Sequence, residues 1–188
     1  MKEQRKAIFM DRDGTINQHV GYIIKAEQFV LLPNISKAID IIHSQGYLAI
    51  IITNQSIIAR GYATIEEVDR IHQKMKEILK TENSYVDAIY MCPHHPTHGR
   101  IKEFSCECEC RKPKAGLILR AAKDLNINLG QSWMIGDSKV DIEAGIKAGC
   151  KTALISTHED YFGQTVTVDS LYQFTDLILN KEGDGQIE

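Results

Sequence analysis

Short apolar runs alternate with longer segments of helical periodicity along most of the chain. Each run holds three to five apolar residues, as expected for a strand that is buried on both faces of a sheet. The runs cover residues 7–10, 48–52, 88–91, 133–135 and 153–155. We therefore predict five buried strands.

Four segments carry an apolar residue at every third or fourth position, as a helix packed on a sheet does. They cover residues 35–42, 64–79, 115–125 and 138–148. Thr64 and Glu67 form a capping box at the start of the second segment, and Gly149 is placed to end the fourth. Residues 165–168 are expected to add an edge strand, and Ser170 is expected to begin a last helix. The alternation of strands and helices predicts an α/β fold with a parallel, doubly wound sheet.

Length and composition fit one globular domain. The chain has 188 residues, of which 43% are hydrophobic and 25% are charged. No internal repeat, low-complexity linker or change in composition divides it. We predict a single domain over residues 1–188, in which residues 181–188 form a frayed tail.

Charge and hydropathy narrow the possible partners. The formal net charge of -3 gives no basic surface for nucleic acid. The apolar run at residues 7–10 is too short for a signal peptide or a membrane span. We therefore expect a cytoplasmic protein without nucleic-acid or membrane partners, and we also expect a monomer. In a reducing compartment, the five cysteines are expected to be metal ligands or core residues rather than disulfides.

Polar residues follow four of the predicted strands at the point where each strand ends. These segments are DRDGT at 11–15, TNQS at 53–56, CPHH at 92–95 and GDSKVD at 136–141. In an open parallel sheet, ligands bind at the carboxyl ends of the strands. The four segments are therefore expected to meet at one site.

The acidic residues of these segments point to a metal. Asp11 and Asp13 repel each other at the end of a buried strand unless a cation lies between them. Asp137 and Asp141, which follow another strand, could complete an oxygen-rich site for a hard cation. Magnesium is the cation that fits this set best.

A carboxylate screened by such a metal can attack an electrophilic phosphorus, and a second carboxylate can pass a proton to the leaving oxygen. Thr53 and Lys112 would then complement the phosphoryl oxygens. Taken singly, DxDGT is also typical of a turn, and GDxxxD of a capped helix. Their order at successive strand ends favours phosphoryl chemistry.

The motifs DRDGT, TN, RKP and GDSKVD stand in the order typical of the haloacid dehalogenase superfamily, which the chain resembles. The resemblance implies that Asp11 is the nucleophile, which forms an aspartyl-phosphate, and that Asp13 is the general acid and base. It implies magnesium bound by the carboxylates of Asp11 and Asp137 and by the backbone carbonyl of Asp13. It also implies that Thr53 and Lys112 stabilise the phosphoryl group.

A narrower set of motifs resembles the D-glycero-D-manno-heptose 1,7-bisphosphate 7-phosphatases over about residues 8–155. The set is DRDGTIN, the pair Gly21 and Tyr22, TNQS with IARG, CPHHP and CxCRKP. The resemblance implies a magnesium-dependent hydrolase that removes the C7 phosphate of a small phosphosugar, in the heptose biosynthesis that serves lipopolysaccharide. The implied substrate-binding residues are His19, Val20, Gly21, Tyr22, Asn54, Gln55, Ser56 and Arg111.

Alternatives remain at this level. Histidinol phosphatases share DRDGT, TNQ, CPH and CxCRKP, whereas IARG favours the heptose enzymes. A catalytically silent, zinc-stabilised phosphosugar-binding module is the rival class, and the intact set of acidic residues argues against it. Two positions depart from the family: Ile57 stands where glycine usually follows TNQS, and Ser138 stands where lysine or arginine commonly follows GD. Lys139 could replace that cation. The spacing of the motifs leaves no room for a separate cap domain.

Four of the five cysteines lie between Cys92 and Cys110. Cys92, His94, Cys108 and Cys110 supply four ligands of the kind that hold a structural, tetrahedral zinc ion. Such an ion would pin the long polar loop and fix Arg111 and Lys112, which follow the last ligand directly. Other ligand sets stay open at this stage, because Cys106 could replace Cys108 and His95 or His98 could compete. Cys150 is expected to be a core residue.

Overall fold

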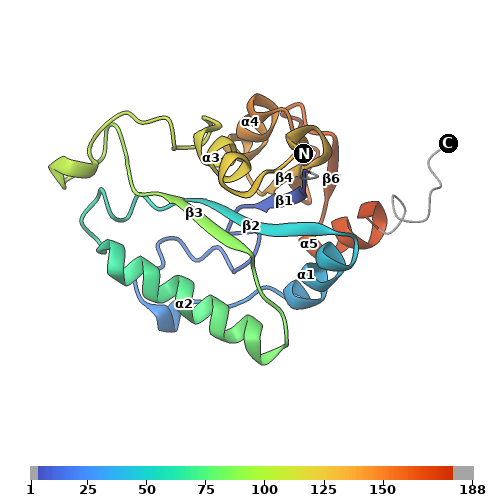
Figure 1. Cartoon of the computed structure of the whole chain (residues 1–188). Coiled ribbons are helices and arrows are strands. Elements are labelled where there is room, and N and C mark those ends of the chain that lie inside the picture. Colours follow the sequence, from blue (N-terminus) through green and yellow to red (C-terminus); the bar gives the residue numbers. More distant parts are fainter. Residues whose placement is uncertain (1–3, 180–188) are drawn as a thin grey trace.

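A six-stranded parallel sheet forms the centre of the molecule (Figure 1). The computed structural model describes residues 4–179, and the strand order across the sheet is β3-β2-β1-β4-β5-β6. The strands are β1 (Lys6–Met10), β2 (Tyr47–Asn54), β3 (Ala88–Cys92), β4 (Trp133–Gly136), β5 (Lys151–Ile155) and β6 (Val166–Val168). All six predicted strands are therefore confirmed, including the short edge strand β6.

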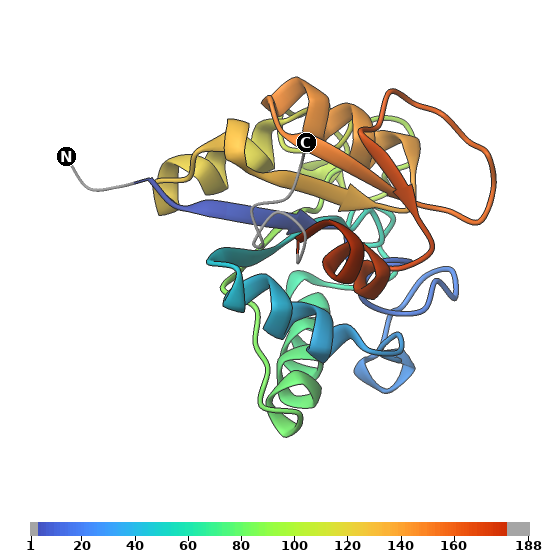
Figure 2. The same cartoon turned by 90° about the vertical axis from the view of Figure 1, so that its right-hand side faces the viewer.

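Helices cover both faces of this sheet (Figures 1 and 2). The helices of one face are α1 (Ile35–Ser44), α2 (Ile65–Thr81) and α5 (Leu171–Phe174), and those of the other face are α3 (Gly116–Leu125) and α4 (Lys139–Ala148). The short helices η1 (Ala26–Gln28), η2 (Lys102–Phe104), η3 (Leu129–Gln131) and η4 (Thr175–Leu179) complete the fold. The predicted doubly wound α/β architecture is confirmed.

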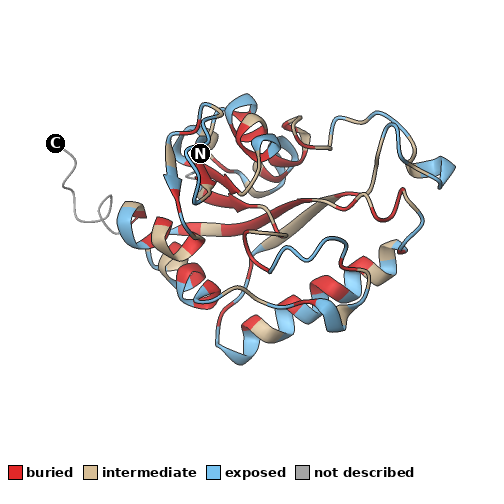
Figure 3. Cartoon of the chain, turned by 180° about the vertical axis from the view of Figure 1, so that it is seen from behind, coloured by how far each residue is buried: buried red, intermediate tan, exposed pale blue. Residues whose placement is uncertain are grey.

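Alternation along β1 gives the sheet its two hydrophobic faces. Ile8 and Met10 pack with the layer of α1, α2 and α5, whereas Ala7 and Phe9 pack with α3 and α4. All four side chains are fully buried, and Figure 3 shows the buried residues concentrated along the sheet. Burial on both faces explains why the strand is an uninterrupted apolar run.

The prediction was wrong for the environment of β3. Its residues 88–91 are only partly buried, although the run was expected to be buried on both faces. Within the described part of the chain, the strand lies at the edge of the sheet and pairs only with β2. An apolar run shows that a strand packs against something, but strand order decides how much of it is covered.

Capping residues fix the start of α2 and both ends of α4, the two helices that flank the site. Thr64 accepts a hydrogen bond from the backbone of Glu67 at 3.2 Å, which is the predicted capping box of α2. Ser138 and Asp141 form a second capping box at the start of α4. Gly149 ends α4 with a φ of 84°, a left-handed conformation that favours glycine.

The order of the strands places the site. The chain moves outward from β1 to β2 and β3, then returns to the other side of β1 with β4. Ligands bind at such a reversal, where loops from neighbouring strands diverge and leave a crevice at their carboxyl ends. Between residues 4 and 179 no separate cap domain covers this crevice, and no helix is long and apolar enough to cross a membrane. The predicted tail at 181–188 lies outside the described residues, so the single domain over 1–188 stays a prediction.

Candidate active site

A cavity of about 420 Å³ opens at the carboxyl ends of β1, β2 and β4. Residues that follow the three strands line it, together with the segment after DRDGT. The lining residues are Asp11, Asp13, His19, Gly21, Tyr22, Ile23, Thr53, Asn54, Gln55, Ser56, Ile57, Lys112, Asp137, Ser138 and Val140. Three of the four segments predicted to meet at one site, DRDGT, TNQS and GDSKVD, therefore do meet there. The prediction was wrong for CPHH at 92–95, none of whose residues lines the cavity, because Cys92 and His94 belong to a separate cluster with Cys108 and Cys110.

Lys112 links the two acidic strand ends. Its ammonium lies 2.8 Å from Asp11 Oδ1 and 2.6 Å from Asp141 Oδ1, and it donates a hydrogen bond to the carbonyl of Ile52 at 2.8 Å. Burial alone would lower the pKa of Lys112, but the two carboxylates outweigh burial and raise this pKa to about 12. Lys112 is therefore a fixed positive charge beside Asp11.

Asp11 lies at the end of β1 in a largely desolvated position. Burial raises its pKa to about 7, and the charge of Lys112 opposes that rise. A divalent cation beside the carboxylate would lower the pKa of Asp11 and keep this side chain ionised at neutral pH. The site as built thus favours a metal next to Asp11.

Asp137 approaches the DRDGT turn closely. Gly14 has a φ of 88°, and a Cβ atom built on it would overlap the Asp137 carboxylate. Burial and then the charge of Asp141 raise the pKa of Asp137. Only glycine allows both this turn and this approach, so the turn brings the second acidic strand end beside the first.

The acidic group fits a hard cation. Carboxylate oxygens of Asp11, Asp137 and Asp141 lie within 4.8 Å of one another. Asp141 already holds Lys112 through Oδ1, and its Oδ2 accepts hydrogen bonds from the backbone and the hydroxyl of Ser138. Both oxygens of Asp141 are thus engaged, whereas Asp11 meets Lys112 through Oδ1 alone, so Asp11 and Asp137 are better placed for a cation and the predicted magnesium ligands stay a prediction.

Asp13 has a different environment from Asp11. Arg12 Nη2 donates to its two carboxylate oxygens at 2.9 and 2.8 Å, Asn17 donates to it at 2.9 Å and Gln55 donates at 3.0 Å. Burial would raise its pKa, but the charge of Arg12 and these hydrogen bonds lower it. Asp13 is therefore ionised at neutral pH in this state.

The TNQS segment supports the other catalytic groups. Thr53 is fully buried, and its hydroxyl accepts a hydrogen bond from Gln55 at 2.8 Å. The Asn54 side chain donates to the carbonyl of Lys112 and accepts from its backbone N–H, both at 3.1 Å. Although Asn54 and Gln55 line the cavity, their side chains therefore hold Lys112, Thr53 and Asp13 in place.

Four predicted metal ligands converge at the base of the loop after β3. The sulfur of Cys110 lies 3.3 Å from those of Cys92 and Cys108, and 3.3 Å from His94 Nδ1. Cys92 lies 3.6 Å from both Cys108 and His94. In a tetrahedral site with Zn–S bonds of about 2.3 Å, ligand atoms lie roughly 3.8 Å apart, so the cluster is close to the size that zinc requires.

The competing ligands lie elsewhere. His95 Nδ1 accepts hydrogen bonds from the backbone of Thr97 and His98 at 3.3 and 3.1 Å. Cys106 is exposed and outside the group of four. Burial is the largest cause that raises the pKa of Cys110, and a bound cation would favour its thiolate instead. Geometry thus supports the set Cys92, His94, Cys108 and Cys110.

Comparison with known proteins identifies the family. Residues 109–164 match the HAD-hydrolase-like family model. The chain is 40% identical over 178 residues to a D-glycero-beta-D-manno-heptose-1,7-bisphosphate 7-phosphatase of Haemophilus ducreyi, which covers 94% of this chain and 93% of the relative. It is also 40% identical over 157 residues to the corresponding alpha-anomer enzyme of Burkholderia mallei, which covers 84% of this chain and 82% of the relative. The chain belongs to the heptose-1,7-bisphosphate 7-phosphatase family.

Solved structures agree with this assignment. A putative HAD-like phosphatase from Mesorhizobium loti has a TM-score of 0.85 at 28% identity and covers 95% of this chain and 88% of its own. The D,D-heptose 1,7-bisphosphate phosphatase of B. bronchiseptica, complexed with magnesium and phosphate, has a TM-score of 0.81 at 29% identity and covers 94% of this chain and 99% of its own. This member of the heptose-1,7-bisphosphate 7-phosphatase family is accordingly a phosphoric monoester hydrolase of the haloacid dehalogenase superfamily.

The residues that the family resemblance assigns to substrate lie in two places. His19, Gly21 and Tyr22 line the cavity with Ser56, whereas Val20 is exposed and does not line it. Arg111 lies outside the lining and donates to the carbonyl of His94 at 3.1 Å, beside the cysteine cluster.

Sequence reasoning missed three residues near the site. Arg12 is buried against Asp13, His72 contacts Arg12 from α2, and Arg60 stacks over the ring of Tyr22 at 5.6 Å. The motif IARG drew attention to the segment of Arg60 but not to its partner. No pattern in the sequence connects residue 12 with residue 72.

The two departures from the family pattern are accommodated. Ile57 is buried in a small apolar cluster with Ile58 and is not among the residues with positive φ, so the loop does not need glycine there. Ser138 caps α4 and holds Asp141. The Lys139 ammonium instead lies 3.6 Å from the Glu143 carboxylate on the exposed side of α4. It therefore does not replace the lysine or arginine side chain that commonly follows GD in the family.

Proposed function

We propose that the protein removes the C7 phosphate of D-glycero-D-manno-heptose 1,7-bisphosphate through an aspartyl-phosphate intermediate. The observation that carries the proposal is the cavity in which Asp11, Lys112 and Asp137 converge beside an ionised Asp13. The names of the relatives supply the substrate class.

Asp11 is proposed to attack the phosphorus while the bond from phosphorus to the C7 oxygen breaks. Asp13 gives its proton to that oxygen, and the dephosphorylated sugar leaves. Water then attacks the aspartyl-phosphate, Asp13 accepts its proton, and inorganic phosphate is released with Asp11 regenerated. Magnesium, held by Asp11, Asp137 and the Asp13 carbonyl, would neutralise charge on the phosphoryl oxygens.

Asp13 has to carry a proton in the first step and to lack one in the second. Its lowered pKa suits the second step, because an ionised carboxylate can accept the proton of the attacking water. The negative charge of an incoming phosphate favours the protonated form that the first step needs. Substrate binding thus favours the protonation of Asp13 that the first step needs and that the free enzyme disfavours.

Lys112 and Thr53 are proposed to stabilise the transferring phosphoryl group. The Lys112 charge lies 2.8 Å from the nucleophile, and its desolvated surroundings strengthen its field. The Asn54 clamp on the Lys112 backbone and the hydrogen bond from Gln55 to Thr53 keep both groups fixed before substrate arrives. Preorganised charge of this kind is often the largest contribution to catalysis.

Two arginines next to lining residues support a second phosphate on the substrate, since Arg60 lies over the ring of Tyr22 and Arg111 directly precedes Lys112. The charges of Arg111 and Arg60 both contribute to lowering the pKa of His95, after burial, which indicates that the three lie near one another. Within residues 4–179, neither arginine has a carboxylate at ion-pair distance. A bisphosphate gains from such a cluster, whereas the ammonium group of histidinol phosphate is repelled by it.

We further propose that a zinc ion bound by Cys92, His94, Cys108 and Cys110 has a structural role. The group offers three sulfur ligands and one nitrogen ligand, which is the composition of a closed zinc site. Arg111 and Lys112 follow the last ligand, so the metal would fix the cations that act on substrate. A monomer acting in the cytoplasm on a small phosphosugar, without nucleic acid or membrane, completes the proposal.

A substrate panel tests the function. Phosphate release is measured with magnesium on both anomers of heptose 1,7-bisphosphate and on histidinol phosphate, with Asp11→Asn as the inactive control. The expected result is a preference for a heptose bisphosphate over histidinol phosphate by at least about a hundredfold in kcat/KM. Preference for histidinol phosphate would establish the rival enzyme, and no release from any substrate would favour a binding module.

A further inference from the structure

Arg12 is the largest fully buried side chain among the described residues, with 1% of its surface exposed. It separates the two catalytic aspartates in the chain, and its guanidinium turns toward Asp13. Nε lies 3.2 Å from Asp13 Oδ1, and Nη2 contacts both carboxylate oxygens. A buried guanidinium needs such partners, because an unpaired N–H group in the interior costs free energy.

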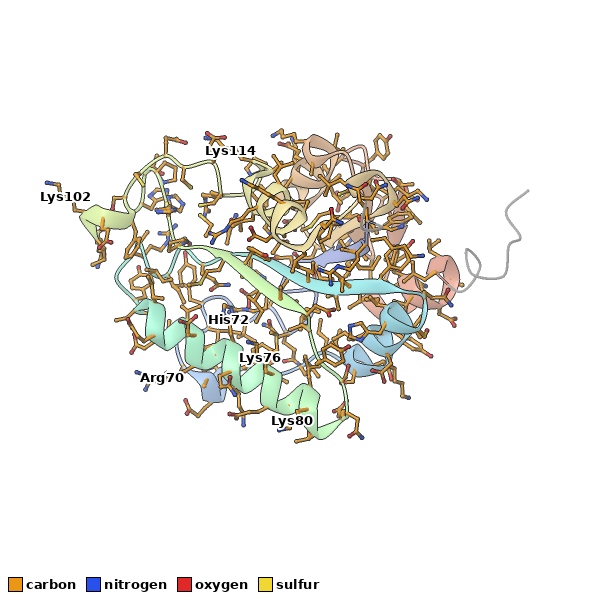
Figure 4. All side chains as sticks on the ribbon, in the orientation of Figure 1. Arg70, His72, Lys76, Lys80, Lys102 and Lys114 are labelled. Carbon is orange, nitrogen blue, oxygen red and sulfur yellow. The ribbon has the colours of Figure 1, made fainter. Side chains whose placement is uncertain are left out.

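The third guanidinium nitrogen of Arg12, Nη1, contacts helix α2 instead of Asp13. Nη1 lies 3.2 Å from Nε2 of His72, which is buried on α2 (Figure 4). Arginine has no acceptor and keeps its charge, so Nε2 has to accept this hydrogen bond. His72 is therefore the neutral tautomer with its proton on Nδ1, the nitrogen that faces Asp69 at 3.9 Å.

His72 lies outside the catalytic cavity. It lines a separate cavity of about 350 Å³ between α2 and β3, together with Asp69, Gln73 and Lys76. Its ring thus faces this cavity on one side and Arg12 on the other. The His72 ring therefore links α2 to Asp13 through one intervening side chain, that of Arg12.

We propose that His72 is a positioning residue that orients Asp13 through Arg12. This inference rests on the proposed function, in which Asp13 moves the proton. Without an acceptor at residue 72, the Nη1 group of Arg12 would have to turn toward water in the cavity beside α2. The planar guanidinium moves as a unit, so that turn would draw Nε and Nη2 away from the Asp13 carboxylate.

The size of the effect follows from what else holds Asp13. Asn17 and Gln55 both donate to its carboxylate and do not depend on Arg12. A displacement of about 1 Å at a catalytic group can lower the rate roughly a hundredfold. With these two partners intact, loss of the His72 contact should lower kcat by about tenfold. KM should change by less than about twofold, since His72 contacts no substrate.

Three variants separate positioning from packing. His72→Leu removes the acceptor, His72→Gln keeps an amide oxygen for Arg12, and Ile71→Val alters the buried face of the same helix while leaving His72 in place. We expect lowered kcat in His72→Leu only, with His72→Gln and Ile71→Val within about threefold of the wild type. If His72→Leu does not fold, His72→Met serves instead, because its thioether is a weak acceptor. Unchanged kcat in the acceptor-free variant, or equal loss in His72→Gln, would overturn the inference.

A double-mutant cycle and crystal structures complete the test. In the Arg12→Lys background, His72→Leu should lower kcat no further, whereas additive losses would contradict a shared route to Asp13. Crystal structures of the variants do not depend on turnover: Arg12 should leave Asp13 in His72→Leu and stay in His72→Gln. A wild type inactive on heptose bisphosphates would refute the proposed function, while these structures would still decide the role of His72.

Discussion

Acid should destabilise the folded protein through His72, and the size of this effect can be worked out from its surroundings. Burial first and then the positive charge of Arg12 lower the pKa of His72 from 6.5 to about 3, with a smaller contribution from Lys76. Asp13 acts in the opposite direction, and Asp69 is too far away for a hydrogen bond. At mildly acidic pH the unfolded chain binds a proton at this histidine that the folded chain does not.

A group with a lowered pKa of this kind contributes a stability that is present above the unfolded pKa and is lost as pH falls below it. Between about pH 7.5 and about pH 5.5, the loss from one histidine with pKa values of 6.5 and about 3 is about 1.4 kcal/mol. The result depends little on the folded value, provided that it lies below about 4.5. The sign would be opposite for a histidine that gains a carboxylate partner.

The assay is urea denaturation of the wild type and His72→Gln at the two pH values, with zinc and magnesium held constant. Other groups titrate over the same range, but they are common to both proteins and cancel in the difference. The free energy of unfolding should fall by about 1.4 kcal/mol more in the wild type than in His72→Gln. Equal losses would show that His72 can bind its proton in the folded state, and the buried contact with Arg12 would then be wrong.

The remaining predictions concern the two metals and the nucleophile. Asp11→Asn should abolish phosphate release with little change in the urea midpoint, and turnover by this variant would exclude the aspartyl-phosphate. Asp137→Ala should keep its fold and require at least about tenfold more magnesium for half-maximal rate, because a carboxylate ligand is lost; an unchanged magnesium titration would refute that ligand. The wild type should contain about one zinc per chain by elemental analysis, Cys108→Ser should lose it and Cys106→Ser should retain it. The opposite pattern would replace Cys108 by Cys106 in the ligand set.

Much of the architecture could be predicted because its signals are local. The buried strands are apolar runs, the capping box of α2 is a pair three residues apart, and Gly149 marks the end of α4. The exposure of β3 could not be predicted, since it depends on strand order. Order is a property of the whole sheet, whereas periodicity describes one strand at a time.

Within the site, too, residues close together in the sequence could be predicted as a group, whereas contacts between distant segments could not. Resemblance and spacing selected Cys92, His94, Cys108 and Cys110, and the fold brings these four together. Because zinc coordination uses short intervals along the chain, its ligands leave a readable pattern.

Contacts between distant segments leave no such pattern. The hydrogen bond from Arg12 to His72 spans sixty residues. The hold of Asn54 on the Lys112 backbone spans fifty-eight. The family resemblance implied substrate contact for Asn54, and a short motif does not show that this side chain holds the Lys112 backbone.

Two neighbouring anchors hold the end of the loop after β3. Cys110, in the cysteine and histidine cluster, and Lys112, held by Asn54, are only two residues apart. A displacement of the residues before Cys110 would have to break the contacts of Cys110 and of the Lys112 backbone before it moved the Lys112 ammonium. The segment that carries His95 and Arg100 has backbone hydrogen bonds of its own, from His95 to Phe104 and from Arg100 to Ala59. The tip of the loop and the Lys112 ammonium are therefore fastened separately within one short stretch of chain.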